Sequence, residues 1–305
     1  MSFHGIIPPV ITPINEDGSV NFDDLASVVE YLITSGVHGI FALGSTGQVA
    51  YLSEETRIAV VKAISTTAAG RVPVIAGAME VSAPGVVRTA RAMIEAGADA
   101  IVTTAPLYTI NDEAEIAEHF RMIRAGIDAP LFAYDIPVRA HKKLSPKLLV
   151  QLGREGVIVG VKDSSGDDVG FRRLIAMNRE ACYPLALFTG HEVVVDAMAM
   201  IGADGAVPGL ANVDAAAYVR LWNAAKAGDM KTAMEEQEYL NRLFEIVFVA
   251  TGRSGDAAGV GAFKAAMGVK GLLSSASLTA PLKPLDAATL EAIGKIVREA
   301  APKAA

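Results

Sequence analysis

Eight short apolar segments recur along most of the chain, and their spacing restricts the possible folds more than any other feature of the sequence. They begin about every 28 residues, which is the length of a strand, a helix and two short loops. The segments between them are amphipathic and carry helix signals: Ser53 precedes two glutamates, and Gly36, Gly70 and Gly97 follow helical patterns. The apolar segments are residues 5–14, 38–47, 72–79, 99–106, 130–137, 157–166, 185–192 and 204–212.

Eight strand–helix units with no linker between them predict an α/β fold, a closed (β/α)8 TIM barrel. The alternative is an open doubly wound sheet, which usually has fewer strands and a glycine-rich turn for a dinucleotide. No G-x-G-x-x-G follows the first apolar segment. Only helical patterns remain toward the C-terminus. We therefore expect a barrel catalytic domain at residues 1–224 and a C-terminal helical extension, residues 225–305, packed on the barrel.

The composition narrows the class of partner. The formal net charge is −7 and no run of basic residues is present, which argues against a nucleic-acid or anionic-membrane partner. The single cysteine, Cys182, excludes an intrachain disulfide and a thiolate metal cluster. No apolar run approaches the roughly 20 residues of a membrane-spanning helix, and the first residues do not resemble a signal peptide. We therefore expect a soluble, cytoplasmic globular protein.

The sixth apolar segment leads into a lysine. Alternate residues of a strand share a face, so Val157, Val159 and Val161 should pack against helices while Gly160 and Lys162 point into the barrel. Active sites of such barrels lie at the carboxyl ends of the strands, where this lysine stands. The pattern therefore predicts a charged side chain inside an apolar lumen, at the end of the barrel where catalysis occurs.

An ammonium group in such a place is costly to desolvate, which favours the neutral amine and lets the lysine attack a carbonyl carbon. The chemistry that this suggests is a Schiff base, or imine. The structural alternative is a lysine whose tip reaches the rim and pairs with Asp163 or another carboxylate. Side chains at other strand ends bear on the choice.

Two other segments end in polar groups. Tyr134, in the fifth segment, could transfer protons, although an aromatic side chain with a satisfied hydroxyl can equally be a plug. In the G-S-T-G turn that ends the second segment, Gly44 and Gly47 flank Ser45 and Thr46. Such a turn can offer backbone N–H groups and hydroxyls to a carboxylate, but alone it is a weak signal.

In chain order these motifs resemble those of the pyruvate-dependent class I lyases, the family of dihydrodipicolinate synthase and N-acetylneuraminate lyase. The resemblance rests on G-S-T-G, Y-D-I-P and G-V-K-D at the ends of the second, fifth and sixth segments. It also includes A-P-L-Y, G-A-D-G-A-V-P-G-L-A-N-V and L-T-A-P-L-K-P-L, and so covers nearly the whole chain.

The resemblance implies a role for each residue. Lys162 would form the imine with the keto carbon of pyruvate, and Tyr134 would carry protons. Ser45 and Gly47 would hold the pyruvate carboxylate, with Thr46 linking Tyr134 into a proton relay. The covalent imine would serve as the electron sink, so that no metal or organic cofactor is required.

The resemblance also implies an oligomer. Tyr108, in A-P-L-Y, matches the tyrosine that family members insert into the site of a neighbouring subunit, which implies a homodimer or a homotetramer. The backbone carbonyl of Val207, in the eighth segment, would lie near the lysine.

The motifs disagree about the second substrate. Arg139 matches the arginine with which dihydrodipicolinate synthases hold the carboxylate of aspartate semialdehyde. Those enzymes usually have T-T-G-E where this chain has S-T-G-Q, with Gln48 in place of the glutamate. Gly190 and Glu192 follow the seventh segment, where the lyases contact sugar hydroxyls, and Glu192 could bind a hydroxylated tail or cap the next helix.

We therefore expect an aldolase or lyase that joins or cleaves pyruvate and a short hydroxylated or carboxylated aldehyde. The alternatives are a dihydrodipicolinate synthase, a keto-deoxy sugar-acid dehydratase and a ligand-binding paralogue without turnover. A metal-dependent aldolase is disfavoured because the five histidines show no paired ligand spacing.

Overall fold

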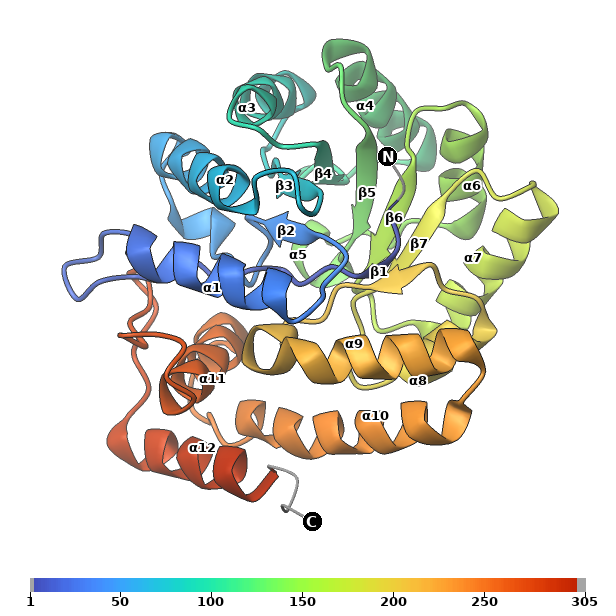
Figure 1. Cartoon of the computed structure of the whole chain (residues 1–305). Helices are drawn as coiled ribbons and strands as arrows, with labels where there is room; N and C mark the ends of the chain where they lie inside the picture. Colours follow the sequence, from blue (N-terminus) through green and yellow to red (C-terminus); the bar gives the residue numbers. More distant parts are fainter. Residues whose placement is uncertain (1–2, 301–305) are drawn as a thin grey trace.

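The computed structural model describes residues 3–300, and eight parallel strands form its centre. The strand order is β1-β8-β7-β6-β5-β4-β3-β2, so the strands from β2 to β8 pair with their neighbours in the chain and β1 pairs with β8 (Figure 1). The ring closes beyond β1, where the backbone N–H of Phe41 donates to the Pro8 carbonyl at 2.9 Å and the N–H of Val10 donates to the Phe41 carbonyl at 2.9 Å. The predicted (β/α)8 barrel is confirmed. The strands are β1 (Gly5–Ile6), β2 (Ile40–Ala42), β3 (Val74–Gly77), β4 (Ala100–Thr104), β5 (Leu131–Asp135), β6 (Gly160–Asp163), β7 (Ala186–Thr189) and β8 (Gly205–Ala206).

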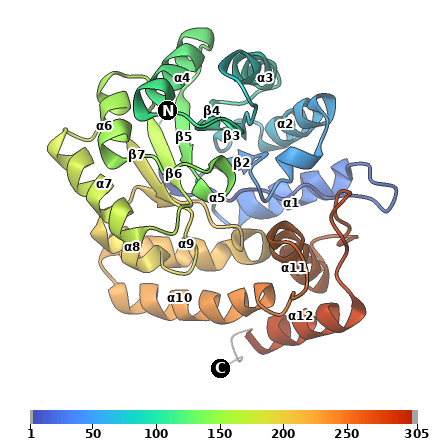
Figure 2. The same cartoon turned by 180° about the vertical axis from the view of Figure 1, so that it is seen from behind.

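Helices surround the strands and continue beyond them, with the short helix α5 near the middle of the barrel when it is seen from behind (Figure 2). The helices up to β8 are α1 (Phe22–Thr34), η1 (Val49–Tyr51), α2 (Glu54–Ala68), α3 (Ala83–Glu95), α4 (Glu113–Gly126), α5 (Pro137–Ala140), α6 (Pro146–Arg154), α7 (Asp168–Glu180) and α8 (Val195–Ile201). The later helices are α9 (Ala211–Ala227), α10 (Met230–Phe244), η2 (Glu245–Val247), α11 (Gly255–Val269) and α12 (Ala287–Ala300).

The predicted helix signals lie at helix ends. The side chain of Ser53 accepts a hydrogen bond from the backbone N–H of Thr56 and caps α2, which has two acidic residues in its first turn. Gly36, Gly70 and Gly97 have φ values of 87°, 71° and 105°, a left-handed conformation that favours glycine and ends a helix. Local sequence therefore fixes these helix boundaries.

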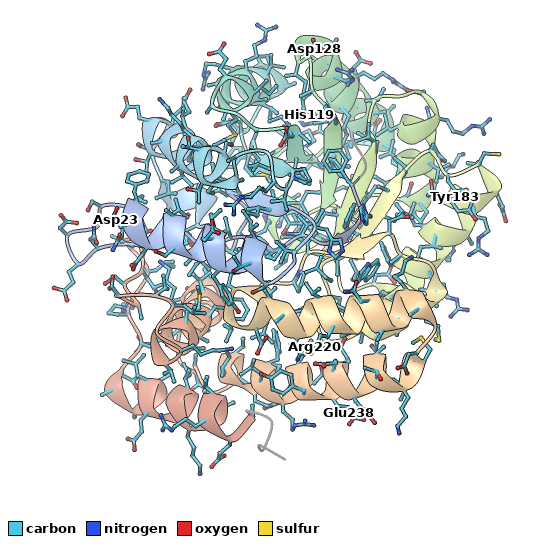
Figure 3. The ribbon with its side chains drawn as sticks, in the orientation of Figure 1. Asp23, His119, Asp128, Tyr183, Arg220 and Glu238 are labelled. Atoms are coloured by element: carbon cyan, nitrogen blue, oxygen red, sulfur yellow. The ribbon has the colours of Figure 1, made fainter. Side chains whose placement is uncertain are left out.

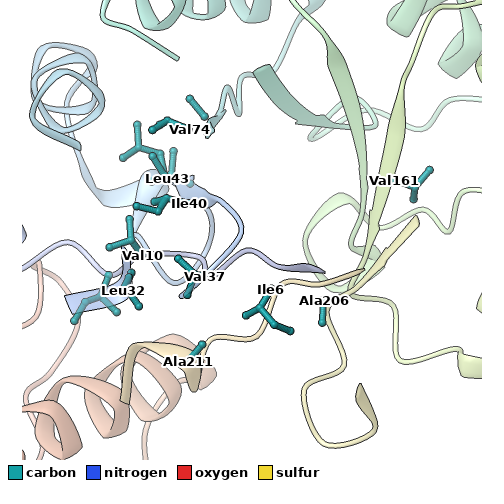
Figure 4. Close-up of a cluster of buried hydrophobic side chains, with 14 of the residues drawn as sticks. Ile6, Val10, Leu32, Val37, Ile40, Leu43, Val74, Val161, Ala206 and Ala211 are labelled. Atoms are coloured by element: carbon teal, nitrogen blue, oxygen red, sulfur yellow. The ribbon is translucent and has the colours of Figure 1, made fainter. Parts of the chain in front are cut away.

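Two separate apolar layers hold the barrel together. The outer layer lies between strands and helices, and Figure 4 shows part of it, including Ile40 on β2 and Val161 on β6. The inner layer fills the barrel with aromatic and branched side chains. Val161 is fully buried in the outer layer, as predicted, whereas Val159 lies before β6 and is 37% exposed. The inner layer is Ile7, Phe41, Ile75, Ala100, Val102, Phe132, Tyr134, Ile136, Phe188 and Val207.

The C-terminal helices pack against one side of the barrel, with α10 alongside α9 and with α12 beyond α11 (Figure 1). Arg220 on α9 faces α10 (Figure 3), and its Nε donates to Oε1 of Glu236 at 2.6 Å. The boundary that we predicted at residue 224 falls within α9, and the division into two domains stays a prediction. Among residues 3–300, none of the helices is long and apolar enough to span a membrane.

Candidate active site

Lys162 and Tyr134 face each other inside the barrel. They are directly opposite in the register of β5 and β6, and both side chains are nearly buried. The Nζ of Lys162 lies 4.2 Å from the centre of the Tyr134 ring and 4.6 Å from the centre of the Phe41 ring. Aromatic faces stabilise an ammonium group that has lost water. In the structure the side chain of Lys162 points into the barrel, in the orientation that the sequence predicts.

Gly160 makes room for this arrangement one layer below. A Cβ atom at Gly160 would lie 2.3 Å from Cε1 of Phe132, so any larger residue would collide with the ring that fills the barrel. Phe132 belongs to the inner layer and supports Lys162 from below. The glycine therefore lets a large aromatic side chain and a lysine occupy successive layers.

The hydroxyl of Tyr134 has a lowered pKa. Burial by itself would raise the pKa, but the charge of Lys162 and hydrogen bonds with Ser164, Lys162 and Ser45 outweigh burial and bring the pKa below its usual value. A phenol with a lowered pKa gives up its proton more readily and can return it, which is what a proton carrier requires. Sequence reasoning missed Ser164, although it lies two residues after Lys162.

The G-S-T-G turn provides hydrogen-bond donors on the opposite wall. Within residues 3–300, the backbone N–H groups of Ser45, Thr46 and Gly47 have no hydrogen-bond partner, so they are available to an anion. The hydroxyl of Ser45 contacts Tyr134, whereas the side chain of Thr46 makes no hydrogen bond in that range. The turn is so tight that a Cβ atom at Gly47 would lie 3.1 Å from Cα of Leu43, which favours glycine at this position. The relay through Thr46 stays a prediction.

A cavity of about 110 Å³ opens beside these groups, and Ser45, Tyr134 and Arg139 all line it. A separate, smaller space of about 20 Å³ lies between Lys162 and the inner layer. Val207 lines that smaller space, close to the predicted position near Lys162. The lining of the larger cavity is Ser45, Gln48, Val49, Ala50, Tyr51, Met79, Thr104, Leu107, Tyr134, Ile136, Arg139 and Asp256.

Arg139 reaches the cavity from α5, but its guanidinium is already paired. Nη1 donates to Oδ2 of Asp256 at 3.0 Å, and Nη2 donates to Oδ1 of the same carboxylate. The hydroxyl of Tyr51 also donates to Oδ2 of Asp256, at 2.7 Å. Asp256 lies in the first turn of α11, in a part of the sequence that carries no motif. Sequence reasoning therefore identified Arg139 and missed its partner.

Glu192 and Gly190 follow β7 as expected. Glu192 does not cap the next helix, because Val194 is the N-cap of α8. Oε2 of Glu192 accepts instead from the backbone N–H of Leu210, at 2.6 Å. Burial raises the pKa of Glu192 to about 7, against the hydrogen bond from Leu210 and the charge of Lys162. Gly190 packs so closely on Ser164 that a Cβ atom would lie 2.1 Å from its Oγ.

Asp135 and Asp163 directly follow Tyr134 and Lys162, and their carboxylates bind Lys143. Lys143 donates to Oδ2 of Asp135 and, at 3.0 Å, to Oδ2 of Asp163. Asp163 thus pairs with Lys143, and no ion pair joins it to Lys162, in contrast to the structural alternative that the sequence left open. Burial raises the pKa of Asp135 to about 6, with the Lys143 hydrogen bond opposing and the charge of Asp163 adding to the rise.

A further buried lysine stands behind the G-S-T-G turn. Lys264 on α11 is fully buried, and its Nζ donates to Oε1 of Gln48 and to the backbone carbonyl of Ser277, both at 2.8 Å. Burial lowers the pKa of Lys264 to about 7. Gln48 is itself buried and left-handed, with φ at 59°. The substitution of glutamine for glutamate therefore leaves this lysine without a carboxylate.

Tyr108 does not reach the cavity of its own chain. It lies in the loop after β4, is 94% exposed and has a φ of 72°, which is strained for a tyrosine. His191, which follows β7, does not line the cavity either, and its Nδ1 lies 3.0 Å from Oδ2 of Asp168. Among residues 3–300 we find no group of three or more histidine, cysteine, aspartate or glutamate side chains placed to hold a metal ion.

Comparisons with known proteins identify the family of this chain. Residues 2–300 match the model of the dihydrodipicolinate synthetase family. The 4-hydroxy-tetrahydrodipicolinate synthase of Methanosphaerula palustris is 30% identical over 97% of this chain and 98% of its own. An uncharacterized DapA-like lyase of Halobacterium salinarum is 33% identical over 94% of this chain and 90% of its own. The crystal structure of YagE from E. coli, in complex with pyruvate, superposes with a TM-score of 0.92 at 26% identity, over 98% of both chains. The chain therefore belongs to the dihydrodipicolinate synthetase family, whose members are pyruvate-dependent lyases of carbon–carbon bonds.

Proposed function

We propose that the protein is a Schiff-base lyase in which Lys162 binds pyruvate covalently and the enamine of pyruvate joins, or is released from, a short aldehyde. One observation carries the proposal: Lys162 ends inside the barrel against Tyr134, and Tyr134 lines the larger cavity together with Ser45 of the G-S-T-G turn. No carboxylate holds the Lys162 ammonium within 4 Å in the described residues. An amine so placed suits attack on a carbonyl.

The steps balance without an added reagent. The amine of Lys162 adds to the keto carbon of pyruvate, and water leaves to give the protonated imine. Loss of a proton from C3 gives the enamine, whose C3 forms a bond to the aldehyde carbon, and water then releases the product. Tyr134 would carry the protons in these steps, and the N–H groups of Ser45 and Gly47 would hold the pyruvate carboxylate. The reaction so written uses no metal or organic cofactor.

The second substrate is a short aldehyde that is hydroxylated or carboxylated. Dihydrodipicolinate synthase activity is the second candidate, because Arg139 lines the cavity and a curated relative carries that name. Gly190 and Glu192 lie after β7, and we propose that they border the path of the substrate tail. A dehydratase acting on a keto-deoxy sugar acid would use the same imine.

We also propose that a second subunit completes the site. Tyr108 is too exposed to act in its own chain, and the resemblance assigns it to the site of a neighbour. The family is typically oligomeric, although one solved structure describes a monomeric dihydrodipicolinate synthase variant. A homodimer or homotetramer in the cytoplasm remains our expectation from the sequence.

Trapping of the imine tests the proposal directly. The protein is incubated with pyruvate and borohydride and then digested, and the peptides are analysed by mass spectrometry. We expect a reduced pyruvate adduct on the peptide with Lys162, and none in Lys162→Arg, which keeps the charge but cannot form the imine. Lys264 is an internal control, because it is also buried but lines neither the larger cavity nor the smaller space beside Lys162.

The absence of an adduct on a folded protein would refute catalysis through Lys162 and favour a ligand-binding role. If the adduct forms, assays of product formation with a panel of aldehydes and keto-deoxy acids distinguish the lyase, synthase and dehydratase activities. Consumption of aspartate semialdehyde would support the synthase, and loss of water from a keto-deoxy acid without carbon–carbon cleavage would support the dehydratase.

A further inference from the structure

Asp256 controls the charge at the far end of the cavity. Its carboxylate binds the guanidinium of Arg139 through both oxygens, and its side chain is 16% exposed while that of Arg139 is 45% exposed. Two parallel N–H···O bonds make this the strongest form of such a pair and fix the plane of the guanidinium. In the structure, the positive charge of Arg139 is therefore neutralised before a substrate arrives.

Tyr51 holds the carboxylate in place from a third direction. Its hydroxyl donates to Oδ2 of Asp256 at 2.7 Å, so Oδ2 accepts from both Tyr51 and Arg139. The three residues come from η1, α5 and α11, three elements far apart in the sequence, and all three line the cavity. This cluster of Tyr51, Arg139 and Asp256, here termed the distal cluster, is a part of the cavity wall to which the C-terminal helices contribute Asp256.

The distal cluster has no net charge, and its groups both donate and accept hydrogen bonds. An incoming carboxylate would have to displace Asp256 from Arg139 or lie beside it, and two like charges in contact repel strongly in a partly buried site. A neutral hydroxyl can instead donate to the Asp256 carboxylate and accept from an N–H of Arg139 or from Tyr51. A chain of hydroxyl groups matches such a surface better than an acid does.

We propose that Asp256 is a specificity-determining residue, which pairs with Arg139 and selects a neutral, hydroxylated aldehyde over an acidic one as the partner of pyruvate. This inference rests on the proposed lyase function and specifies its second substrate. It also revises the expectation that Arg139 would bind a substrate carboxylate. If Arg139 were unpaired, an acidic aldehyde would be the better substrate. In this chain Asp256 binds the guanidinium that the substrate carboxylate would otherwise contact.

Asp256→Asn tests the inference, because asparagine has nearly the same shape but cannot neutralise Arg139. Pyruvate consumption is measured with D-glyceraldehyde, which is neutral and hydroxylated, and with succinic semialdehyde, which is acidic. We expect the wild-type protein to prefer D-glyceraldehyde. In Asp256→Asn the ratio of the two kcat/KM values should shift by about tenfold or more toward succinic semialdehyde.

A matched control exists in the same C-terminal region. Asp286 also pairs with an arginine, at 3.0 Å from Nη2 of Arg253, but it does not line the cavity. Asp286→Asn makes the same change of charge and keeps a residue that can cap α12, so the substrate ratio should remain that of the wild type. Tyr51→Phe removes one donor to Asp256 and should shift the ratio in the same direction as Asp256→Asn, by less.

A binding measurement separates failure of the inference from failure of the lyase function. After borohydride reduction with pyruvate, an adduct on Lys162 shows that the imine on which the lyase function depends still forms. Calorimetry on this reduced protein then compares succinate with glycerol, and succinate should bind Asp256→Asn more tightly than the wild type. An unchanged succinate affinity and an unchanged kcat/KM ratio in Asp256→Asn, or a wild-type preference for succinic semialdehyde, would overturn the inference. A missing adduct would instead refute the lyase function on which it rests.

Discussion

Gln48 shows how one residue can alter the electrostatics behind a binding turn. It follows the G-S-T-G turn directly, and its Oε1 is one of two oxygen atoms that hold the buried ammonium of Lys264. Neither acceptor carries a charge, and burial lowers the pKa of Lys264 to about 7. The folded state therefore resists protonation of this lysine, whereas the unfolded chain has the usual pKa near 10.4.

Gln48→Glu should stabilise the protein most at neutral pH. In the wild type the unfolded state binds one more proton than the folded state between about pH 7 and pH 10, so the free energy of unfolding rises with pH through Lys264. A glutamate at position 48 would pair with Lys264, raise its pKa and remove this rise. The gain over the wild type should be largest near pH 7 and shrink by roughly 1 kcal/mol for each pH unit above it.

Urea denaturation of both proteins at pH 7, 8 and 9, at one protein concentration, measures the difference. Lys264→Met in both backgrounds completes a double-mutant cycle, in which the effect of Gln48→Glu should lose its pH dependence. A gain that is constant across this range would mean that Lys264 is not the group responsible.

At the scale of elements, the periodic features were predictable and the tertiary contacts were not. Alternation along β6 was enough to place Lys162 inside the barrel, because the two faces of a strand must alternate. The pairing of Arg139 with Asp256 could not be foreseen, since the two residues are 117 positions apart in the chain and no sequence pattern links α5 to α11. The contact of Ser164 with Tyr134 was not predicted either, because the position of Ser164 depends on how the chain turns after β6.

The carboxyl ends of β5 and β6 are joined by a third lysine. Asp135 follows Tyr134 and Asp163 follows Lys162, so the two aspartates are opposite each other in the register of β5 and β6. Lys143 bridges their carboxylates. Without this bridge two partly buried negative charges would face each other, and the strand ends that carry Tyr134 and Lys162 would move apart. Lys143 is therefore a positioning residue.

Lys143→Met should lower both stability and kcat. Asp135 has a pKa of about 6 in the folded state, above its unfolded value, so its contribution to stability is full below the unfolded value near 3.9 and is lost as pH rises through 6. Without Lys143 this pKa should rise further, and the loss should continue across neutral pH. Thermal unfolding should therefore show a larger drop in Tm at pH 8 than at pH 5.

The kcat with pyruvate and its preferred aldehyde should fall by about tenfold, because small displacements of reacting groups are costly. Lys142→Met is the control, since within residues 3–300 Lys142 makes no ion pair. A Lys143→Met protein with the pH dependence and kcat of the wild type would show that the bridge is incidental.

At the scale of the whole molecule, the loop after β4 lacks a partner in the single chain. Tyr108 and Ile110 are almost completely exposed, at 94% and 103% of their reference areas, and Tyr108 holds a strained backbone conformation. Exposed apolar side chains on one loop are available to a second subunit, which is the role that the resemblance implies for Tyr108.

Mixing two inactive variants tests whether Tyr108 acts in the site of a neighbour. Tyr108→Phe keeps Lys162 but lacks the donated hydroxyl, and Lys162→Arg keeps Tyr108 but cannot form the imine. If each site combines Lys162 of one subunit with Tyr108 of the other, a mixed dimer contains one complete site and one that lacks both groups. Subunits unfolded together and refolded at equal concentrations should recover about a quarter of the wild-type activity, because half of the dimers are mixed and each has one working site. If Tyr108 acted within its own chain, both sites of every mixed dimer would lack one group, and the mixture would remain as inactive as its components.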